Sequence, residues 1–449
     1  MGLKCFFDLH VVVQTQFTPL RAPGAIKRLA KVKVESTNNG QQPSGFPDCT
    51  RFRDAYVARM LFEKTPLGCR ALAAILAVVG GVRVQAAELL FRLHAINAES
   101  TFEACAAIDV NRDGKLDIVS GGFWYEAPSW KRHVVREVEK LGDPPQYDGY
   151  SHLEMDVNRD GWTDLIHVNW RSKSIYWLEH PGKNLGEWPK HLIAEPGFME
   201  TGRLYDIDDD GRMDVLPSGA RFAAWWELLK GEPGAAPQWT RHDLPKEVSG
   251  HGTGFGDING DGRGDVIGPR GWLEAPVDRR EGQWLWHPEF DLIQGSVPII
   301  VADVNGDGRN DLIWSMGHNY GVYWLEQAQV NGQRIWRQHT IDESWSVGHS
   351  PLWVDMDNNG TPEYVVGKRY RAHELRDPGA LDPLVVYRYE YDKVAGKFQR
   401  YPIQAAGGPA GGGLDPKAVD MDGDGDLDLI LPGRSGLYLY ENLLYSSQR

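Results

Sequence analysis

The stretch DVNRDGKLD, residues 109–117, decides the fold of this chain, because its pattern returns six more times. An acid or Asn stands at positions one, three and five, Gly at six and an acid at nine, and an aliphatic run follows. The other copies are DVNRDGWTD (156–164), DIDDDGRMD (206–214), DINGDGRGD (257–265), DVNGDGRND (303–311), DMDNNGTPE (355–363) and DMDGDGDLD (420–428). They start 47, 50, 51, 46, 52 and 65 residues apart, so each copy marks one structural unit.

Each unit contains four short segments of the kind that form β-strands. One apolar stretch precedes the acidic loop, a second follows it, and a third is rich in aromatics, as in IYWLEH (175–180). A fourth carries an aromatic residue with His three places later: Trp130 and His133, Trp188 and His191, Trp239 and His242, Trp284 and His287, Trp336 and His339. Four strands in about 50 residues predict the blade of a β-propeller.

The seventh repeat lacks a fourth segment, and the missing one stands before the first repeat. Phe91 and His94 reproduce the aromatic and His signature there. We therefore predict an all-β, seven-bladed propeller of four-stranded blades, closed by an N-terminal strand that completes the last blade. Because these histidines recur at one strand position, we interpret them as packing or hydrogen-bonding residues between strands.

The N-terminal region predicts export. From Met60, the basic residues Lys64 and Arg70 lead into the apolar run 71–82, and small residues follow. This order is typical of a secretory signal peptide, and the run is too short for a membrane span. We expect an unstructured or non-native extension at 1–59, a signal peptide at 60–86 and a mature propeller at 87–449 without a transmembrane span. The protein is then secreted or periplasmic.

Composition narrows the possible partners. The chain has 449 residues, 41% hydrophobic and 24% charged, which is ordinary for a globular protein. Its formal charge of -14 argues against nucleic acid, because phosphate binding requires a basic surface. Much of the acidity lies in the seven loops, where bound cations can neutralise it. Only Cys105 of the four cysteines follows the expected cleavage point, so the mature chain has no internal disulfide.

The acidic loops have the chemistry of calcium sites. Side chains at positions one, three, five and nine offer hard oxygen ligands, which favour Ca²⁺, and Gly at six permits the tight turn. An EF-hand is excluded, because position twelve is never the Glu that it requires. The predicted ligands are Asp109, Asn111, Asp113, Asp117, Asp156, Asn158, Asp160, Asp164, Asp206, Asp208, Asp210, Asp214, Asp257, Asn259, Asp261, Asp265, Asp303, Asn305, Asp307, Asp311, Asp355, Asp357, Asn359, Glu363, Asp420, Asp422, Asp424 and Asp428.

On these motifs the chain resembles the FG-GAP or VCBS repeats of integrin-α-like propellers, from about Leu89 to Leu444. The resemblance implies that up to seven calcium ions have a structural role. The sixth loop departs most from the pattern, with Asn359, Pro362 and Glu363 at positions five, eight and nine. We expect it to bind calcium most weakly.

Residues that do not repeat indicate where chemistry takes place. The face opposite the loops carries the start of each first strand and the loop after each second strand. There we predict a catalytic set of His251, His349, His152, Tyr150 and Glu200. In a second interpretation, His152, His251 and His349 bind a transition metal. Cations and a histidine on the same face form the predicted substrate-binding set: Arg171, Arg221, Arg270, His318, Arg369 and Arg434.

Two hypotheses for function stay open. The first is a carbohydrate-active lyase or dehydratase, in which His or Tyr abstracts a proton next to a carbonyl or carboxylate. The Trp-rich blades also resemble the propeller of aldos-2-ulose dehydratases, which carry cupin domains as well; we expect no cupin here, and no residue is transferred. The second is a non-enzymatic propeller that binds glycans or proteins. The expected partner is a carbohydrate or another small anionic or polyol ligand.

Overall fold

The chain divides into two units, residues 1–86 and 87–449. The computed structural model describes residues 16–20, 27–31, 89–142 and 146–445. In the first unit it describes β1 (Gln16–Leu20) and β2 (Lys27–Lys31), which form an antiparallel pair. The predicted signal peptide, 60–86, lies outside the described residues, as does most of the predicted extension 1–59.

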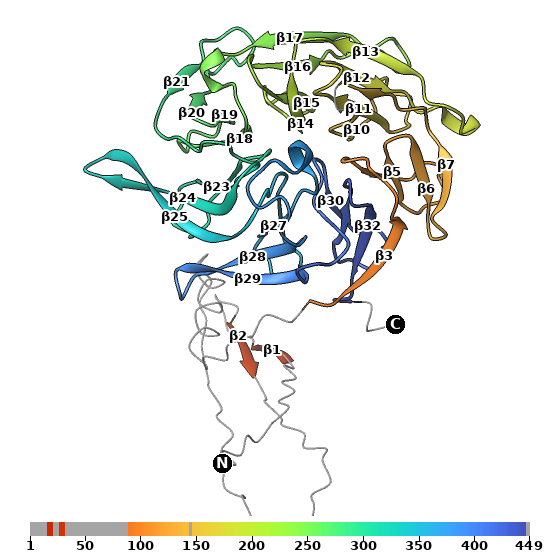
Figure 1. Cartoon of the computed structure of the whole chain (residues 1–449). Coiled ribbons are helices and arrows are strands. Elements are labelled where there is room, and N and C mark those ends of the chain that lie inside the picture. Colours follow the sequence, from red (N-terminus) through yellow and green to blue (C-terminus); the bar gives the residue numbers. More distant parts are fainter. Residues whose placement is uncertain (1–15, 21–26, 32–88, 143–145, 446–449) are drawn as a thin grey trace, which may run out of the picture. The chain divides into compact units, whose positions relative to one another are not determined.

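In residues 89–142 and 146–445, seven four-stranded antiparallel sheets form a ring (Figure 1). The predicted all-β, seven-bladed fold is confirmed. Blades one to six contain, in chain order, β4 (Ala106–Ile108), β5 (Asp117–Ser120), β6 (Phe123–Glu126) and β7 (Lys131–Val134); β10 (Leu153–Met155), β11 (Asp164–Val168), β12 (Ile175–Leu178) and β13 (Lys190–Ala194); β14 (Met199–Tyr205), β15 (Asp214–Gly219), β16 (Ala224–Leu228) and β17 (Trp239–Asp243); β18 (Gly254–Gly256), β19 (Asp265–Gly268), β20 (Gly271–Glu274) and β21 (Leu285–His287); β22 (Ile300–Ala302), β23 (Asp311–Ser315), β24 (Tyr320–Val330) and β25 (Gln333–Ser346); β26 (Leu352–Val354), β27 (Glu363–Gly367), β28 (Val386–Asp392) and β29 (Lys397–Gln404).

The seventh blade combines strands from the two ends of the second unit. Its sheet order is β3-β32-β31-β30, with β3 (Phe91–Asn97), β30 (Lys417–Val419), β31 (Asp428–Leu431) and β32 (Leu437–Asn442). Strand β3 pairs antiparallel with β32, and Phe91 lies opposite Asn442. The fourth strand of this blade therefore comes from before the first repeat.

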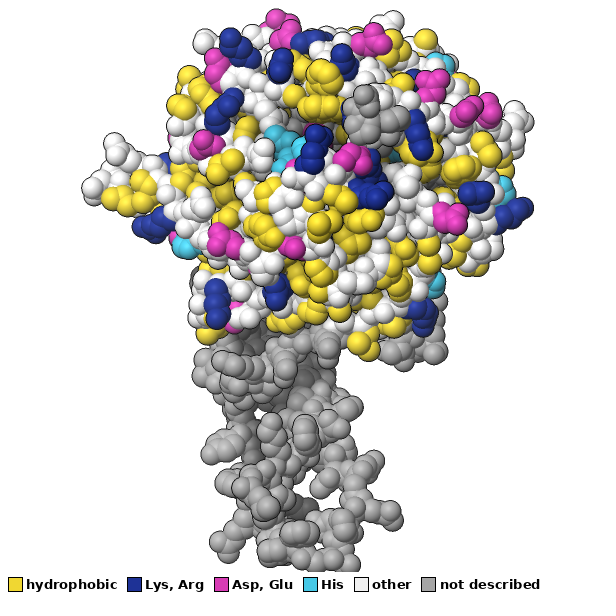
Figure 2. All heavy atoms as spheres, in the orientation of Figure 1, with side chains coloured by type: hydrophobic (Ala, Val, Ile, Leu, Met, Phe, Trp, Pro, Cys, Tyr) yellow, Lys and Arg dark blue, Asp and Glu magenta, His cyan; other side chains and the backbone are white. Residues whose placement is uncertain are grey.

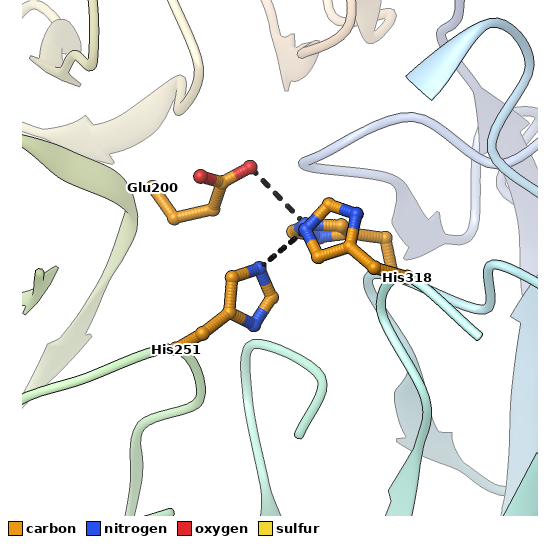
Figure 3. A group of neighbouring side chains, drawn as sticks. Glu200, His251 and His318 are labelled. Atoms are coloured by element: carbon orange, nitrogen blue, oxygen red, sulfur yellow. Dashed lines mark hydrogen bonds and ion pairs between the residues drawn. The ribbon is translucent and has the colours of Figure 1, made fainter. Parts of the chain in front are cut away.

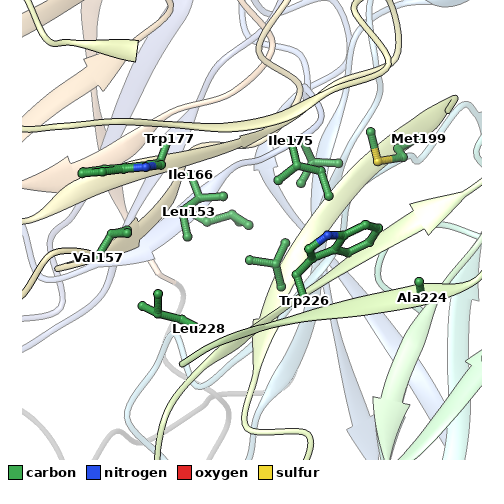
Figure 4. Packing of buried hydrophobic residues seen from close by; sticks show 11 residues of the cluster. Leu153, Val157, Ile166, Ile175, Trp177, Met199, Ala224, Trp226 and Leu228 are labelled. Atoms are coloured by element: carbon green, nitrogen blue, oxygen red, sulfur yellow. The ribbon is translucent and has the colours of Figure 1, made fainter. Parts of the chain in front are cut away.

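The core lies between neighbouring blades. Strands alternate their side chains, so each sheet presents an apolar face to the blade on either side. Between blades two and three, Ile166 and Trp177 of one sheet pack with Val215 and Trp226 of the next, all under 5% exposed (Figure 4). Burying each such large side chain contributes roughly 1.5–3 kcal/mol. Six further clusters of this kind join the remaining pairs of blades among the described residues.

The recurring histidines are structural, as predicted from their repetition. In blade three, Nε2 of His242 lies 2.9 Å from a carboxylate oxygen of Glu227, and the imidazole stacks on Trp225 at 4.1 Å between ring centroids. Stacking on Trp and pairing with Glu recur in four more blades, at His133, His191, His287 and His339. Each imidazole thus ties the fourth strand to the third.

Insertions distinguish the face opposite the acidic loops. A small hairpin, β8 (Lys140–Leu141) and β9 (Gln146–Tyr147), precedes blade two, and η3 (Ala372–Leu375) follows the second strand of blade six. The other short 3₁₀ turns are η1 (Gly182–Asn184) and η2 (Lys246–Val248). Within the described part of the chain, no helix has the length and apolar character needed to cross a membrane.

Candidate functional site: an axial histidine cluster opposite the acidic loops

The acidic loops have one hydrogen-bonding scheme, repeated in every blade. In the first, the two carboxylate oxygens of Asp109 accept the backbone N–H groups of Asp113 and Gly114, at 3.0 and 2.9 Å. The same two bonds occur in the other six loops. The Gly at position six has φ between +84° and +98° in all seven, which explains why only glycine stands there.

The acid at position nine is buried beneath each loop. Asp117 is 0% exposed, and its two oxygens accept the backbone N–H groups of Val110 and Ala127 at 3.1 and 2.8 Å. Burial raises the pKa of Asp117 to about 6, that of Asp164 to about 7 and that of Asp214 to about 8. Such acids are stabilised in their charged form by a neighbouring cation.

Carboxylate oxygens converge in three of the loops. Within the described residues, three acids have ligand atoms within 4.8 Å of one another in loops three, six and seven: Asp206, Asp208 and Asp210; Asp355, Asp357 and Glu363; Asp420, Asp422 and Asp428. The first, second, fourth and fifth loops offer Asn at position three instead. Hard oxygen donors in this arrangement fit a calcium ion, which remains a prediction.

Arginines approach two of these loops. Nη2 of Arg280 lies 2.6 Å from Asp208 and 3.0 Å from Asp210 in loop three. In loop six, the guanidinium of Arg388, 2% exposed, lies 2.8 Å from Glu363. A cation of the protein itself therefore already offsets part of the negative charge in these two loops.

On the opposite face, four side chains from non-repeating positions meet at the ring axis (Figure 3). Glu200 lies near the start of β14, His251 precedes β18, His318 follows β23, and His349 precedes β26. One ligand atom of each lies within 4.8 Å of the others. The space-filling view shows histidine side chains in a hollow at the middle of this face (Figure 2). We call these four residues the axial cluster.

The hydrogen bonds around the axial cluster fix the tautomers of its histidines. Nδ1–H of His251 donates to the carbonyl oxygen of Gly295 at 2.8 Å, and Nδ1–H of His318 donates to Asp377 at 3.1 Å. Each ring therefore presents an unprotonated Nε2, and these two nitrogens lie 2.9 Å apart. Two facing lone pairs repel unless a proton or a cation lies between them.

His349 presents a third nitrogen to the same point. Its Nδ1 lies 3.4 Å from Oγ of Ser350, whose hydroxyl donates to the carbonyl oxygen of Leu414. Its Nε2 lies 3.1 Å from Oε1 of Glu200, yet without hydrogen-bond geometry, so among the described residues this buried nitrogen has no hydrogen-bond partner. Three imidazoles and one carboxylate with outward hydrogen bonds are a typical ligand set for a transition metal.

The protonation states of the axial cluster suit the binding of a cation. Burial lowers the pKa of both His318 and His349 to about 3, so both imidazoles are neutral at physiological pH. Burial opposes ionisation of Glu200, but the positive charge of Arg369 nearby helps to hold the pKa of Glu200 well below its usual value. Neutral imidazoles and an ionised carboxylate are the protonation states that a metal requires.

A buried ion-pair chain supports Glu200 from behind. Nη1 of Arg369 lies 3.3 Å from Glu200, while its Nε and Nη2 bind both oxygens of Glu103 at 2.8 and 3.1 Å. All three side chains are nearly inaccessible to solvent. Arg369 was predicted to bind substrate, but its bonds to the two carboxylates instead make it a positioning residue for the axial cluster.

The loop after β27 adds a histidine and an acid beside His318. Asp377 accepts hydrogen bonds from Nδ1–H of His318 and from Nδ1–H of His373, the latter at 2.9 Å. The rings of His373 and His318 stack at 4.2 Å. Residues 371, 373, 374 and 375 have positive φ without being glycine, and this strain is common at functional sites. The loop therefore holds His373, an exposed base, next to the axial cluster.

The remaining predicted residues are not part of the axial cluster. His152 was grouped with His251 and His349 as a metal triad, and the structure corrects this grouping. Its ring is fully buried elsewhere: Nδ1 lies 3.4 Å from the carbonyl oxygen of Val119, and the ring contacts that of His167. His318, predicted to bind substrate, takes the place that was assigned to His152.

Tyr150 and one of the predicted arginines, Arg434, line a polar cavity of about 220 Å³ beside the axial cluster. The hydroxyl of Tyr150 donates to Gln146 at 3.1 Å, and burial raises the pKa of Tyr150. Arg171 also donates to Gln146, and Arg434 binds Glu374 at 2.8 Å. Arg221 and Arg270 are exposed and line none of this cavity. The predicted ring of cations is therefore only partly assembled.

Sequence reasoning missed Asp377, Gln146, Glu374 and Lys140. These residues lie in the two insertions, which have no counterpart in other blades, so no repeated position in the sequence identifies them. The length of the blade-six insertion, about 368–383, was the one available signal.

Comparisons with known proteins agree with the repeat pattern. An FG-GAP-like repeat model matches residues 156–216 and 303–366. No curated protein sequence matches the chain. Similar solved structures include the exotype rhamnogalacturonan lyase YesX (11% identity, 92% of this chain, 80% of that chain, TM-score 0.46) and a lectin from Agrocybe aegerita that recognises non-reducing terminal N-acetylglucosamine (16% identity, 76% of this chain, 84% of that chain, TM-score 0.38). The chain therefore carries FG-GAP-like repeats within a seven-bladed β-propeller.

Proposed function

We propose that the axial cluster binds one divalent transition-metal ion and that the protein is a metal-dependent, carbohydrate-active lyase or dehydratase. The observation that carries this proposal is the convergence of three unprotonated Nε2 atoms and one carboxylate, each oriented by an outer hydrogen bond or ion pair. The recurring structural histidines each stack on a Trp and hydrogen-bond to a Glu on the neighbouring strand. The three histidines of the axial cluster do not stack on a Trp, and they contact one another instead. Their arrangement therefore calls for a ligand.

A metal held here supplies Lewis-acid polarisation of a carbonyl or carboxylate on a bound sugar. The protein provides the base. His373 has Nδ1–H committed to Asp377, so its Nε2 is free to accept a proton, and the side chain is 55% exposed beside His318. A sugar whose carbonyl or carboxylate faces the axial cluster then loses its neighbouring C–H proton to Nε2 of His373. The electrons of that C–H bond form a C=C bond as the bond to the leaving group at the next carbon breaks, and the leaving group takes up the proton from His373.

The supporting residues fix orientation and charge. Asp377 holds both His318 and His373, so one carboxylate aligns a ligand and a base. Burial opposes its ionisation, yet the hydrogen bonds from both histidines keep the pKa of Asp377 below its usual value.

We further propose that the seven acidic loops bind calcium and brace the blades of an exported protein. The support is their common hydrogen-bonding scheme and the buried acid at position nine. In this role calcium replaces the disulfides that the propeller lacks.

The test combines elemental analysis with an activity screen. We expect the purified protein to carry about one transition metal per chain and to form unsaturated products, seen by ultraviolet absorbance, from oxidised sugars or uronate oligosaccharides. His318→Ala abolishes both signals, while the matched rim variant His287→Ala keeps both. If the purified protein contains no transition metal, the proposed metal centre is refuted. If the protein binds glycans on an array but forms no product, it is a glycan-binding propeller and not an enzyme of this class.

A further inference from the structure

The polar cavity beside the axial cluster has the composition of a sugar subsite. It is lined by residues before blade one, by the β8–β9 hairpin and by the blade-six insertion. Glu103 belongs to its lining and also binds Arg369, which in turn contacts Glu200 of the axial cluster. The cavity and the axial cluster therefore share one buried wall.

Aromatic side chains form part of this lining. The rings of Phe102 and Tyr147 lie 4.6 Å apart between centroids and are tilted by 46°. Both are half-buried, so each packs on one side and keeps surface open to the cavity. Aromatic faces of this kind bind the C–H face of a sugar ring.

Two cations in the lining have no ion-pair partner among the described residues, so within this part of the chain they can bind an anion. Within residues 89–142 and 146–445, no carboxylate lies at ion-pair distance from Lys140 or Arg371. Nζ of Lys140 lies 4.8 Å from the centre of the Tyr147 ring, so charge and aromatic surface are adjacent. A ligand that carries an anion next to a sugar ring matches both features.

The other charges of the cavity are already occupied. Arg434 binds Glu374 at 2.8 Å and the carbonyl oxygen of Arg371, and Gln146 donates to Glu374 at 2.9 Å. Glu103 is neutralised by Arg369. The third acid, Asp148, is 6% exposed and accepts the backbone N–H of Ser172. Among the described residues, Lys140 and Arg371 are therefore the lining cations that no carboxylate pairs with.

We propose that this cavity is a subsite for an anionic sugar unit, with Lys140 and Arg371 binding its acidic group and Phe102 and Tyr147 binding its ring. The assignment rests on the proposed function and deepens it, since it names the class of substrate. The favoured ligand is a uronate, because a uronate carboxylate also activates its neighbouring C–H bond for the proposed proton abstraction. A sulfated sugar shares the anionic chemistry, and the experiment separates the two.

Isothermal titration calorimetry tests the subsite without turnover when it is carried out in a His251→Ala background. The probes are galacturonate trisaccharide, its neutral methyl ester and a sulfated neutral trisaccharide. We expect the galacturonate to bind and the ester to bind at least about tenfold more weakly. Arg371→Ala and Lys140→Ala each weaken galacturonate binding about tenfold or more, and Lys397→Ala, an exposed lysine on β29, leaves it unchanged.

Each outcome decides a specific point. Equal affinity for the acid and its ester, or no effect of Arg371→Ala, overturns the subsite. If the sulfated trisaccharide binds more tightly than galacturonate, the anionic subsite is supported and its preferred ligand is a sulfated sugar, not a uronate. Selective galacturonate binding without product formation in the unsubstituted protein overturns the lyase and keeps the subsite. If the unsubstituted protein forms products from neutral sugars alone, the anionic subsite is overturned and the lyase is supported. The two proposals can therefore fail independently.

Discussion

The acidic loops and the axial cluster both gather carboxylates, but they differ in how their polar atoms are satisfied. In the loops, backbone N–H groups saturate the acid at position one in the same way seven times. In the axial cluster, the nitrogens of His251 and His318 face each other 2.9 Å apart, and that of His349 has no hydrogen-bond partner among the described residues. Polar atoms that are hydrogen-bonded in the same way in every repeat indicate a structural scaffold. A single cluster whose polar atoms lack hydrogen-bond partners indicates a functional site.

The largest expected effect tests the scaffold half of this comparison. Chelation of calcium lowers the melting temperature by about 10 °C or more, because several sites each contribute roughly 2–3 kcal/mol when calcium is in excess. Differential scanning calorimetry with and without added calcium measures this. The control is Lys397→Ala, at an exposed position on β29, whose melting temperature in calcium stays within about 2 °C of the unsubstituted protein. An unchanged melt after chelation refutes the structural role of calcium.

The next effect concerns the axial cluster. Asp377→Asn removes the acceptor that orients His318 and His373, so we expect transition-metal affinity to fall by about tenfold to hundredfold. Competition with a chromogenic chelator measures this affinity. The melting temperature in calcium stays unchanged, which a merely structural role would not allow. Asp243→Asn, on the exposed end of β17, is the matched control.

A third effect comes from the acids at position nine. In the calcium-free protein, their folded-state pKa values, about 6 for Asp117, about 7 for Asp164 and about 8 for Asp214, lie above the unfolded value near 3.8. The native state then binds more protons, so stability falls as pH rises through about 6 to 8. Thermal melts between pH 5 and 8 test this. Saturating calcium should flatten the profile, and a melting temperature that rises with pH without calcium would contradict the prediction.

The smallest effect distinguishes one loop from another. Arg388 already neutralises Glu363 in loop six, whereas loop seven has no such arginine among the described residues. At moderate free calcium, Asp422→Asn should lower bound calcium by about one ion per chain, and Asp357→Asn should lower it less. Elemental analysis after dialysis gives both numbers. Equal losses would show that Arg388 does not weaken loop six.

Much of the fold follows from the sequence, because each blade repeats the same local pattern. The spacing of the loops, the aromatic and His signature and the displaced pair at Phe91 and His94 are all visible in the order of the amino acids. The site is harder to predict, since it depends on how different blades meet at the axis. His251 and His349 each stand six residues before the first acid of their loop, so the sequence places them at equivalent positions. The replacement of His152 by His318 depends on side-chain direction, which the sequence does not show.

The insertions could not be predicted in detail for a different physical reason. The blade-six loop adopts a strained backbone at His373 and Glu374, and no local pattern specifies positive φ for such residues. Asp377 acquires its role only because this backbone returns it to His318. A repeat pattern in the sequence does not predict long-range contacts of this kind.

The stacked pairs of Trp and His at the rim give the molecule a built-in spectroscopic label. In blades one to five an imidazole lies 4.1–4.5 Å from an indole, nearly parallel to it. The ring current of each indole displaces the proton resonances of its imidazole to high field, while the histidines of the axial cluster, which have no indole partner within the described residues, resonate elsewhere. A proton spectrum can therefore report the integrity of individual blades and the occupancy of the axis at the same time.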